Sequence, residues 1–498
     1  MPVSVQITDL DSQLPIHHAL AAFEDQPFVM LFDSASHHRK RDAQYTVLTA
    51  DPVAVMRLES AAFGSDPFTI LRSWERRLPA VPPQEQDDLP PFFGGIAGLM
   101  SYELGQAFER IPCAGIDDFK TPALLAGLFD WAIVWDHLAG TVRSYVLALQ
   151  NPEERKPGEH EEDRAAWIKA SLRNSPGMKS LIERESEAPA EPILPRIGRS
   201  LAFPPDQNKP FLAASPFRHR IEPTSDVFSD FTRDQYLTAV ARVIEYIRAG
   251  DIFQANLSQR LIAPWSGTAM QLYCSLRTNN PAPFCAFLKT DDFSIVSASP
   301  ERFLKVDRSR QVETRPIKGT RRRQRSPIAD LYVSSELSTS EKDRAENVMI
   351  VDLLRNDISR SCQAGSVRVT GLCEVERFET VLHLVSTVVG TLREDRDAWD
   401  LMSGCFPGGS ITGAPKIRAM EIIAELEPTV RGAYCGSLFF RGPCGDFDSS
   451  ILIRTFTYKD GWVQFPVGGG IVADSDPLDE YRETLHKASG MIRALRPV

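Results

Sequence analysis

The sequence predicts an α+β fold built largely on antiparallel sheet. Strand-like segments follow one another across short turns, and helical segments are grouped between hairpins instead of alternating with single strands. The chain has 498 residues, of which 43% are hydrophobic and 24% charged, as is typical of a soluble globular protein with material for a large core. We find no internal repeat.

Residues 1–150 mix short apolar runs with turns. The segments 45–60 and 128–149 are predicted to be strands with hairpin connections. The segment 88–105, DLPPFFGGIAGLMSYELG, is rich in glycine and apolar residues, which suits backbone buried against another element.

Residues 151–230 differ from the rest in composition. They begin with a charged run, NPEERKPGEHEEDR, and continue with proline-rich segments. We interpret this region as a surface insertion and linker, with a short helix near 164–172.

A helix is predicted from residue 232. Thr232 and Gln235 have the spacing of a capping box, and Gly250 is a plausible end of the helix. Its expected apolar stripe consists of Leu237, Val240, Ile244 and Ile247.

The remaining elements follow in the same way. Pro415 is expected in the first turn of one helix and Pro477 near the start of another, and Asp460–Gly461 at a hairpin turn. The sequence predicts a strand over 251–265, hairpins over 284–306 and 449–472, and helices from Ser340 to 357, over 414–427 and over 476–495.

Composition argues against several classes of protein. A net charge of −10 and a pI near 5.5 do not suit binding of nucleic acid or anionic membrane over a broad surface. Eight cysteines without a CxxC pair indicate thiols of a reducing compartment. The N-terminal residues show no basic n-region and no apolar h-region, so we expect no signal peptide. The apolar stretch 121–135 is interrupted by Asp130 and too short to span a bilayer. We therefore expect a cytoplasmic protein.

Two late helices each present a pair of carboxylates on one face. Asp343 and Glu346 are three residues apart, as are Glu480 and Glu483, and Lys487 lies one turn further along. Such pairs could bind a hard cation such as Mg²⁺, which prefers oxygen ligands and retained water. The alternative is two solvated helix faces with weak ion pairs, and spacing alone favours it.

Glycine-rich and isolated polar residues add weaker candidates. The segment CFPGGSITGAPK, 405–416, is not a Walker A motif but could hold an anion at a helix start. Glu301, after a proline at a strand end, could be a general acid if burial raises its pKa. His383 lies in an apolar context. Each also has a structural interpretation: a tight turn, a surface glutamate and a buried core histidine.

Lys318 lies on an expected turn within a cationic tract, ETRPIKGTRRR, that also contains Arg315 and Arg321–Arg323. One interpretation is a solvated basic loop. The other is an amine made nucleophilic because cationic neighbours and desolvation lower the pKa of a lysine.

A series of motifs resembles the chorismate-utilising enzymes, and within them most closely the aminodeoxychorismate synthases. The resemblance is strong over 231–498, reaches the N-terminal part through PFVMLFDS and DLPPFFGGIAGLMSYELG, and leaves 151–230 unmatched. It implies the fold of that family, with mostly antiparallel sheets in a sandwich and helices packed outside. The motifs occur in the order GDIFQANLSQR, SASPERF, TRPIKGT, EKDRAENVMIVDLLRND, HLVST, FPGGSITGAPKIRAMEII, ILIRT and GGGIVADSDPLDEYRET.

The resemblance implies a role for each matched residue. Glu346 and Glu483 match Mg²⁺ ligands, with Asp343 and Glu480 in supporting positions. Glu301 matches the general acid that protonates the departing C4 hydroxyl of chorismate, and His383 matches a histidine beside the ring. The matched substrate contacts are Arg454, Lys487, Ser410, Tyr434, Gly469 and Gly470.

Two positions separate members of this family. Isochorismate-forming and salicylate-forming relatives have a lysine base where this chain has Gln254, which argues against water as the nucleophile. Anthranilate synthases have alanine where this chain has Lys318, a lysine typical of aminodeoxychorismate synthases. The implied reaction begins with addition of Lys318 to C2 of chorismate, after which ammonia attacks C4 and gives 4-amino-4-deoxychorismate.

The resemblance also implies partners. The chain has no cysteine in the G-x-C-x-G setting of glutamine amidotransferases, so a separate glutaminase subunit is expected to supply ammonia. Residues 1–150 resemble the family's region with a tryptophan pocket, where Ser34 matches a lining serine; bound tryptophan is structural in some members and inhibitory in others. The rival functions are anthranilate synthase component I and a catalytically silent regulatory subunit that binds chorismate or tryptophan.

Overall fold

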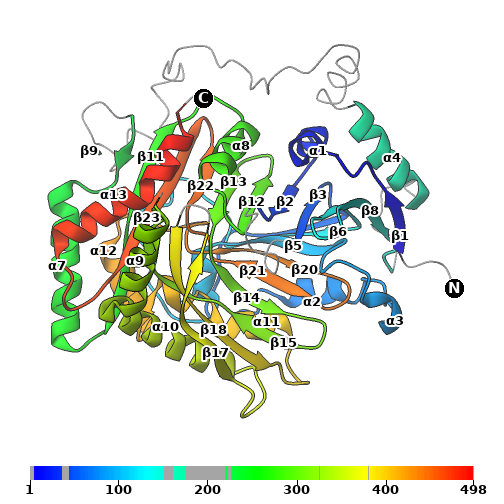
Figure 1. Ribbon diagram of the computed structural model, residues 1–498. Coiled ribbons are helices and arrows are strands. Elements are labelled where there is room, and N and C mark those ends of the chain that lie inside the picture. The colour runs from blue at the N-terminus through cyan, green and yellow to red at the C-terminus, as the bar shows by residue number, and fades with distance from the viewer. Residues whose placement is uncertain are drawn as a thin grey trace.

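Two large antiparallel sheets form the body of the protein, with helices packed outside them (Figure 1). The structure is a computed structural model, and it describes residues 5–35, 44–150, 161–174, 219–221, 226–324, 326–378 and 381–496. The predicted α+β class is confirmed. Among the described helices, none is long and apolar enough to cross a membrane.

The first sheet contains 13 strands. Short β19 (Gly413–Ala414) pairs with one of its long strands, β11. The order of the others is β1 (Val5–Asp9), β8 (Thr141–Leu147), β7 (Trp131–Asp136), β3 (Tyr45–Thr49), β2 (Val29–Asp33), β12 (Phe284–Lys289), β13 (Ser294–Ser299), β22 (Thr455–Lys459), β23 (Trp462–Ile471), β11 (Gln254–Pro264), β10 (Phe228–Ser229) and β9 (His219–Arg220).

The second sheet contains ten strands. β17 (Arg368–Arg377) pairs with β18 beside the main path. The order along that path is β16 (Ile317–Arg322), β18 (Val381–Thr391), β15 (Gln311–Thr314), β14 (Arg302–Val306), β21 (Phe447–Ser450), β20 (Ser437–Arg441), β5 (Gly95–Met100), β6 (Leu124–Phe129) and β4 (Ala54–Leu58).

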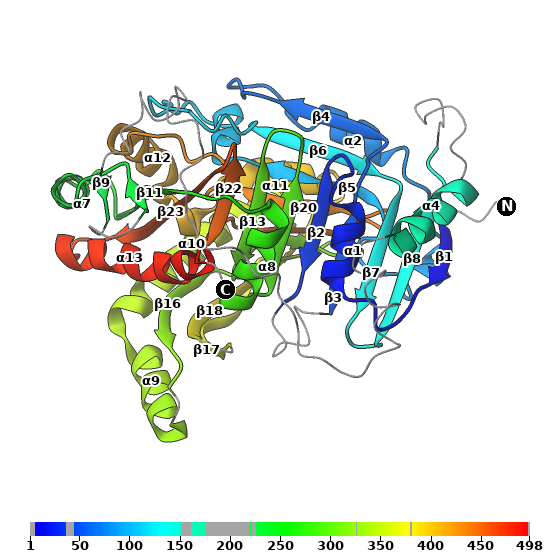
Figure 2. The same ribbon diagram turned by 90° about the horizontal axis from the view of Figure 1, so that it is seen from above.

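Helices cover the outer faces. Seen from above, α13 (Pro477–Ala494), α8 (Ala269–Asn279), α1 (Ile16–Phe23) and α4 (Glu161–Asn174) lie over the first sheet (Figure 2). The other helices within the described residues are α2 (Thr69–Glu75), α3 (Pro83–Gln86), α7 (Arg233–Ala249), α9 (Pro327–Thr339), α10 (Glu341–Ser359), α11 (Ala398–Cys405) and α12 (Lys416–Leu426), with 3₁₀ turns η1 (Tyr102–Ala107) and η3 (Gly409–Ile411).

The largest apolar core includes side chains from both sheets. Met30 and Ile295 of the first sheet belong to the same cluster as Ile96 and Leu304 of the second. A second cluster joins the first sheet to α1, α4, α8 and α13. Both sheets also contain strands from before residue 150 and after residue 231, because β2 pairs with β12 and β5 pairs with β20.

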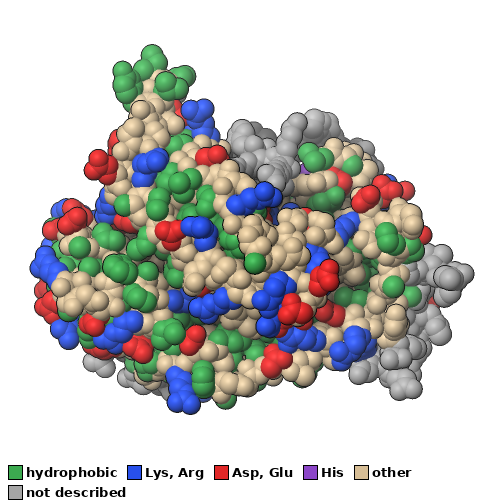
Figure 3. All heavy atoms as spheres, turned by 90° about the horizontal axis from the view of Figure 1, so that it is seen from below, with side chains coloured by type: hydrophobic (Ala, Val, Ile, Leu, Met, Phe, Trp, Pro, Cys, Tyr) green, Lys and Arg blue, Asp and Glu red, His purple; other side chains and the backbone are tan. Residues whose placement is uncertain are grey.

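Helix α9 projects from the body of the molecule (Figure 2). Its buried residues are Asp330 and Leu337. The space-filling view shows hydrophobic side chains at the end of this projection (Figure 3), where Ile328, Leu331 and Tyr332 are exposed.

Most local predictions are confirmed. Thr232 and Gln235 form the capping box of α7, which ends at Gly250 in the left-handed conformation. Ser340 caps α10, and Asp460 and Gly461 both have positive φ at the β22–β23 turn. α4 covers the helix predicted near 164–172, whereas most of 151–230 lies outside the described residues.

Some predictions about pairing and burial are wrong. β3 and β4 do not form a hairpin, because the chain turns at Asp51 (φ 49°) and passes from one sheet to the other. Of the apolar stripe predicted for α7, Val240 and Ile244 are buried as expected, whereas Leu237 and Ile247 are only partly buried. The buried face also includes Tyr236, whose ring packs against Tyr481 of α13. Pro415 precedes α12 as its N-cap.

Two short crossings between the sheets matter most for the site. Pro300 and Glu301 alone separate β13 of the first sheet from β14 of the second. Residues Ile451–Arg454 carry the chain back from β21 to β22, and the Ile451 N–H donates to the Glu301 carbonyl at 3.0 Å. Glu301 and Arg454 are therefore placed at the seam of the sandwich.

Candidate active site

Lys318 lies within strand β16 and not on a turn, so that local prediction is wrong. The strand pairs with β18, and its register shifts between Lys318 and Thr320. Gly319, with φ 75°, occupies this irregularity. The glycine that suggested a turn therefore belongs to a β-bulge, a feature that re-aims neighbouring side chains.

The Lys318 amine is held among charged groups from three other elements. Its Nζ donates to the carbonyl of Ser410 on η3 at 3.2 Å. Burial lowers the pKa of Lys318 below the ordinary 10.5, against the opposing charges of Glu346 and Glu301, and Lys487 lowers it further. A lowered pKa makes the neutral, nucleophilic amine easier to form.

Three of the four arginines of the cationic tract form ion pairs with other carboxylates. Arg315 forms an ion pair with Glu376, Arg321 with Asp343 at 3.0 Å, and Arg323 with Asp330 at 2.9 Å. The cation that acts on Lys318 is instead Lys487 of α13, more than 160 positions away in sequence.

Glu301 is a buried carboxyl beside this amine. Its side chain is 4% exposed. Burial raises its pKa to about 7, although a hydrogen bond from Ser410 and the positive charges of Lys318 and Arg454 oppose the rise. A carboxyl with a pKa near neutrality can hold and release a proton at physiological pH, as a general acid must.

The four predicted carboxylates lie on α10 and α13, which approach the site from outside the sheets. Burial raises the pKa values of Glu346 and Glu480, and the two act on each other as like charges. Burial would also raise the pKa of Glu483, but its ion pair with Lys487 at 2.7 Å lowers it instead.

These carboxylates alone do not form a complete set of metal ligands. Asp343 is paired with Arg321, and Glu480 accepts from Ser475 at 2.7 Å. Within the described ranges, no group of three or more His, Cys, Asp or Glu side chains is close enough to hold a metal ion alone.

The glycines of β23 allow side chains to approach closely. A Cβ on Gly469 would lie 3.2 Å from Glu480 Oε2 and 3.6 Å from Lys487 Nζ. A Cβ on Gly470 would lie 2.1 Å from Gln254 Nε2. A side chain at position 469 would therefore crowd the charged groups of α13, and one at position 470 would collide with Gln254 of β11.

The other predicted residues fall in different surroundings. His383, on β18, shares a 2.9 Å hydrogen bond between its Nδ1 and the Thr320 hydroxyl, two residues from Lys318. Tyr434 is buried next to the Arg431 guanidinium. Ser34 lies apart, after β2, where its hydroxyl donates to the Tyr45 carbonyl on β3.

Sequence reasoning missed two buried polar residues. Asn347 follows Glu346, donates to the Leu384 carbonyl at 3.3 Å and accepts from Ser386, which ties α10 to β18. Arg431 connects the end of α12 to η3 and β11 through its guanidinium. The available signal for Asn347 was an amide on the apolar face of a helix beside Ile350 and Val351.

Comparisons with known proteins identify relatives along most of the chain. The family model of chorismate binding enzymes matches residues 28–493. Aminodeoxychorismate synthase component 1 of Escherichia coli (strain K12) is 38% identical over 94% of this chain and 93% of its own length. Anthranilate synthase component 1 of Streptomyces coelicolor is 42% identical over 87% of this chain and 78% of its own length.

A solved structure extends the comparison to the fold. Anthranilate synthase component I from Streptococcus pneumoniae TIGR4 matches with a TM-score of 0.69 and 29% identity, covering 90% of this chain and 92% of the other. The family model and these relatives each span most of the sequence. The chain therefore belongs to the chorismate-binding enzyme family.

Proposed function

We propose that the protein is an aminodeoxychorismate synthase component I, which converts chorismate and ammonia to 4-amino-4-deoxychorismate with Lys318 as a covalent nucleophile. The observation that carries the proposal is the placement of the Lys318 amine, with a lowered pKa, beside the Glu301 carboxyl, whose pKa is about 7. Covalent amination needs such a pair, a neutral amine and a protonated carboxyl, at the same pH.

The chemical steps follow from these two groups. The Lys318 Nζ adds to C2 of chorismate, the ring double bond shifts, and the C4 hydroxyl leaves as water with the proton of Glu301. Ammonia then adds to C4, the double bond shifts back, and the C2–Nζ bond of the protonated secondary amine breaks to release Lys318 as a neutral amine. The ammonium formed at C4 returns a proton to the Glu301 carboxylate. One difficult substitution is thereby divided into two easier ones.

Positive side chains on two elements are proposed to hold the carboxylates of chorismate. Arg454 lies at the seam between the sheets, and Lys487 lies on α13, where its Nζ also donates to the Gly468 carbonyl at 2.8 Å. Ser410, Tyr434 and the backbone of Gly469 and Gly470 complete the proposed contacts. His383 would lie beside the ring.

The helix carboxylates fit a Mg²⁺ ion only if ligands come from elsewhere as well. One carboxylate from each helix, Glu346 and Glu483, would bind the ion, and Asp343 and Glu480 would support them. Water and a substrate carboxylate would supply the remaining oxygens, in keeping with the preference of Mg²⁺ for a partly retained water shell. Bound there, Mg²⁺ would neutralise the substrate carboxylate.

The source of ammonia is proposed to be a separate glutaminase subunit. The relatives are named as component 1, which implies a second component. The purified chain should therefore aminate chorismate with ammonium, but with glutamine only after a glutaminase subunit is added. Glutamine-dependent turnover by the chain alone would contradict this part of the proposal.

Anthranilate synthase component I is the second candidate, because a relative of that name is 42% identical. The two reactions give different products from the same reagents. Mass and NMR spectra of the product from chorismate, ammonium and Mg²⁺ decide between them: 4-amino-4-deoxychorismate supports the proposal, and anthranilate with pyruvate rejects it.

A further inference from the structure

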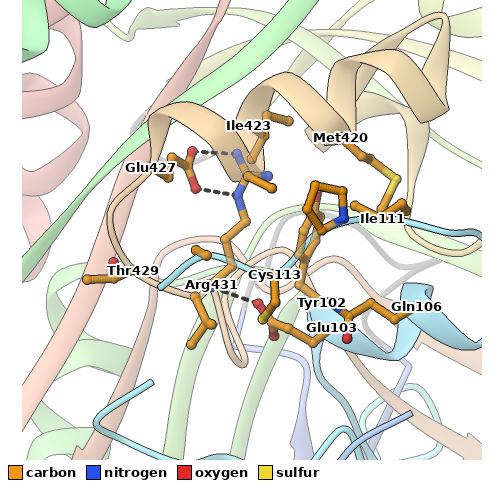
Figure 4. A pocket seen from close by; sticks show the side chains of 14 residues that line it. Tyr102, Glu103, Gln106, Ile111, Cys113, Met420, Ile423, Glu427, Thr429 and Arg431 are labelled. Carbon is orange, nitrogen blue, oxygen red and sulfur yellow. Dashed lines mark hydrogen bonds and ion pairs between the residues drawn. The ribbon is translucent and has the colours of Figure 1, made fainter. Parts of the chain in front are cut away.

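Arg431 lies at the centre of a buried polar cluster on the inner side of the candidate site. It follows α12, and its side chain is 3% exposed. Figure 4 shows Arg431 and Glu427 directed toward each other above Tyr102 and Glu103, beside a cavity of about 30 Å³. Burying a guanidinium is costly unless every donor is matched, so the bonds that it makes are informative.

The guanidinium binds three separate segments of the chain. It donates to both carboxylate oxygens of Glu427, at 2.9 and 2.7 Å. It also donates to the carbonyl of Ile411 at 2.9 Å and to the carbonyl of Asn256 at 2.6 Å. The end of α12, the 3₁₀ turn η3 and strand β11 are thereby joined through one side chain.

Two of these segments, η3 and β11, carry a residue of the candidate site. Ile411 directly follows Ser410, whose carbonyl accepts the Lys318 hydrogen bond. Asn256 lies two residues after Gln254 on β11, and its N–H donates to the Thr412 carbonyl at 2.7 Å. The guanidinium also lies 5.8 Å from the ring centre of Tyr434.

The backbone of Arg431 is fixed as well. The N–H groups of Arg431 and Gly432 donate to the Glu103 carboxylate at 2.9 and 3.0 Å. On its other face the guanidinium covers the Tyr102 ring at 4.8 Å. Glu103 and Tyr102 belong to η1, so the N-terminal region holds the loop that leads to Tyr434.

We propose that Arg431 is a positioning residue for the reaction on chorismate: it sets where the Ser410 carbonyl, and with it the Lys318 amine, lies relative to the bound ring. It acts through Ile411 and Asn256 and does not itself touch the substrate. The planar guanidinium has five donors in a fixed arrangement, which allows it to hold two carbonyls and a carboxylate together.

The test replaces Arg431 with lysine. Arg431→Lys keeps the charge opposite Glu427 but has three donors on a flexible chain, and it cannot hold all three segments at once. Chorismate consumption is measured with saturating ammonium and Mg²⁺. The choice of ammonium as the nitrogen source rests on the proposed function. A wild-type protein that consumes no chorismate would count against that function; the positioning role is judged from the ratio of variant to wild type.

We expect kcat of Arg431→Lys to fall by about tenfold or more, because small displacements of reacting groups are costly. The KM for chorismate should change by less than about threefold, because Arg454 and Lys487, its proposed charged contacts, lie outside this cluster, and Ser410 and Tyr434 are shifted in the variant but not removed. A loss confined to KM, or an unchanged kcat in the folded variant, would overturn the proposal.

Arg260 provides the matched control. It is equally buried, at 2% exposed, and lies on the same strand as Asn256, but its guanidinium bonds Asp118 and Gln464. Arg260→Lys should lower the melting temperature comparably and leave kcat within about threefold of wild type. Equal losses of kcat in both variants at equal loss of stability would reduce Arg431 to a structural residue.

A milder variant covers the case in which Arg431→Lys does not fold. Glu103→Gln keeps an acceptor for one of the two backbone N–H groups and leaves the guanidinium in place. We expect the same pattern at smaller size, with kcat lowered by about threefold and KM unchanged. A folded Glu103→Gln protein with wild-type kcat would also contradict the proposal.

Discussion

The substitution Glu301→Gln should make the protein more stable at alkaline pH and remove most of its activity. A glutamine has nearly the shape of the carboxyl but cannot ionise. The rise of the Glu301 pKa from an ordinary 4.5 to about 7 means that the folded protein resists ionisation of this buried group. At about 1.4 kcal/mol per tenfold change, the resistance amounts to about 3 kcal/mol.

The sign of the effect follows from proton binding. Below pH 4.5, Glu301 is protonated in both folded and unfolded chains, so no stability is lost. Between pH 4.5 and about 7 the unfolded chain loses this proton while the folded one keeps it, and wild-type stability falls as pH rises. Above about pH 7 Glu301 is ionised in both folded and unfolded chains, so the stability that wild type has lost no longer changes with pH.

The assay is urea unfolding of wild type and Glu301→Gln at pH 5 and pH 8, without added metal. The stability of the variant relative to wild type should increase by about 2 to 3 kcal/mol between the two pH values. The difference between pH values removes any constant effect of the amide on packing. Glu245→Gln, an exposed carboxylate in a surface ion pair, should show no such change.

The activity of Glu301→Gln should fall, although its stability at pH 8 rises relative to wild type. Loss of a general acid typically lowers kcat by about 10² to 10⁴. A variant whose relative stability is the same at pH 5 and pH 8 would refute the buried, raised-pKa description of Glu301. Near wild-type kcat would refute its role as the acid.

The other predictions concern the Lys318 amine, the proposed Mg²⁺ ligands and Gly469. When ammonia is withheld, mass spectrometry should find a chorismate-derived adduct on the PIKGT peptide of wild type but not of Lys318→Arg or Lys318→Ala. Near-normal turnover by Lys318→Arg would mean that Lys318 acts only through its positive charge and not as a nucleophile. Glu346→Gln or Glu483→Gln should raise the Mg²⁺ concentration needed for half-maximal turnover by about tenfold or more, with unfolding by urea little changed, since a ligating charge is removed; full turnover at limiting Mg²⁺ would exclude either residue as a ligand. Gly469→Ala should raise the KM for chorismate at constant melting temperature, because its methyl group would sit 3.2 Å from Glu480 Oε2; an unchanged KM would place the substrate away from β23.

Local structure was predictable because its causes are close in sequence. The Thr232 cap, the Gly250 helix end and the Asp460–Gly461 turn each depend on a few neighbouring residues. The motifs around Glu301 and Lys318 likewise identified the family, which the comparisons confirm.

The choice of sheet for each strand was not predictable in this way. The residue patterns of β3 and β4 predict strands but do not indicate which of the two sheets each strand joins. The turn at Asp51 also does not reveal that the chain passes from one sheet to the other. The surroundings of Lys318 depend on distant residues, since Glu376 takes Arg315 and Lys487 comes from the last helix. Arg431 reads as an ordinary charged residue after a helix until its three partners are known.

The pairing of early with late strands has a consequence for biosynthesis. Ile96 of β5 is paired with Arg441 of β20, so one edge of β5 has no partner until the ribosome has made most of the chain. At about 5–20 residues per second, the wait is roughly 20 to 70 seconds. During that time the apolar strands β5 and β6 can pair with each other but cannot complete their sheet. The nascent N-terminal region is therefore expected to depend on chaperones, and its aggregation during expression should decrease when translation of the later codons is made faster.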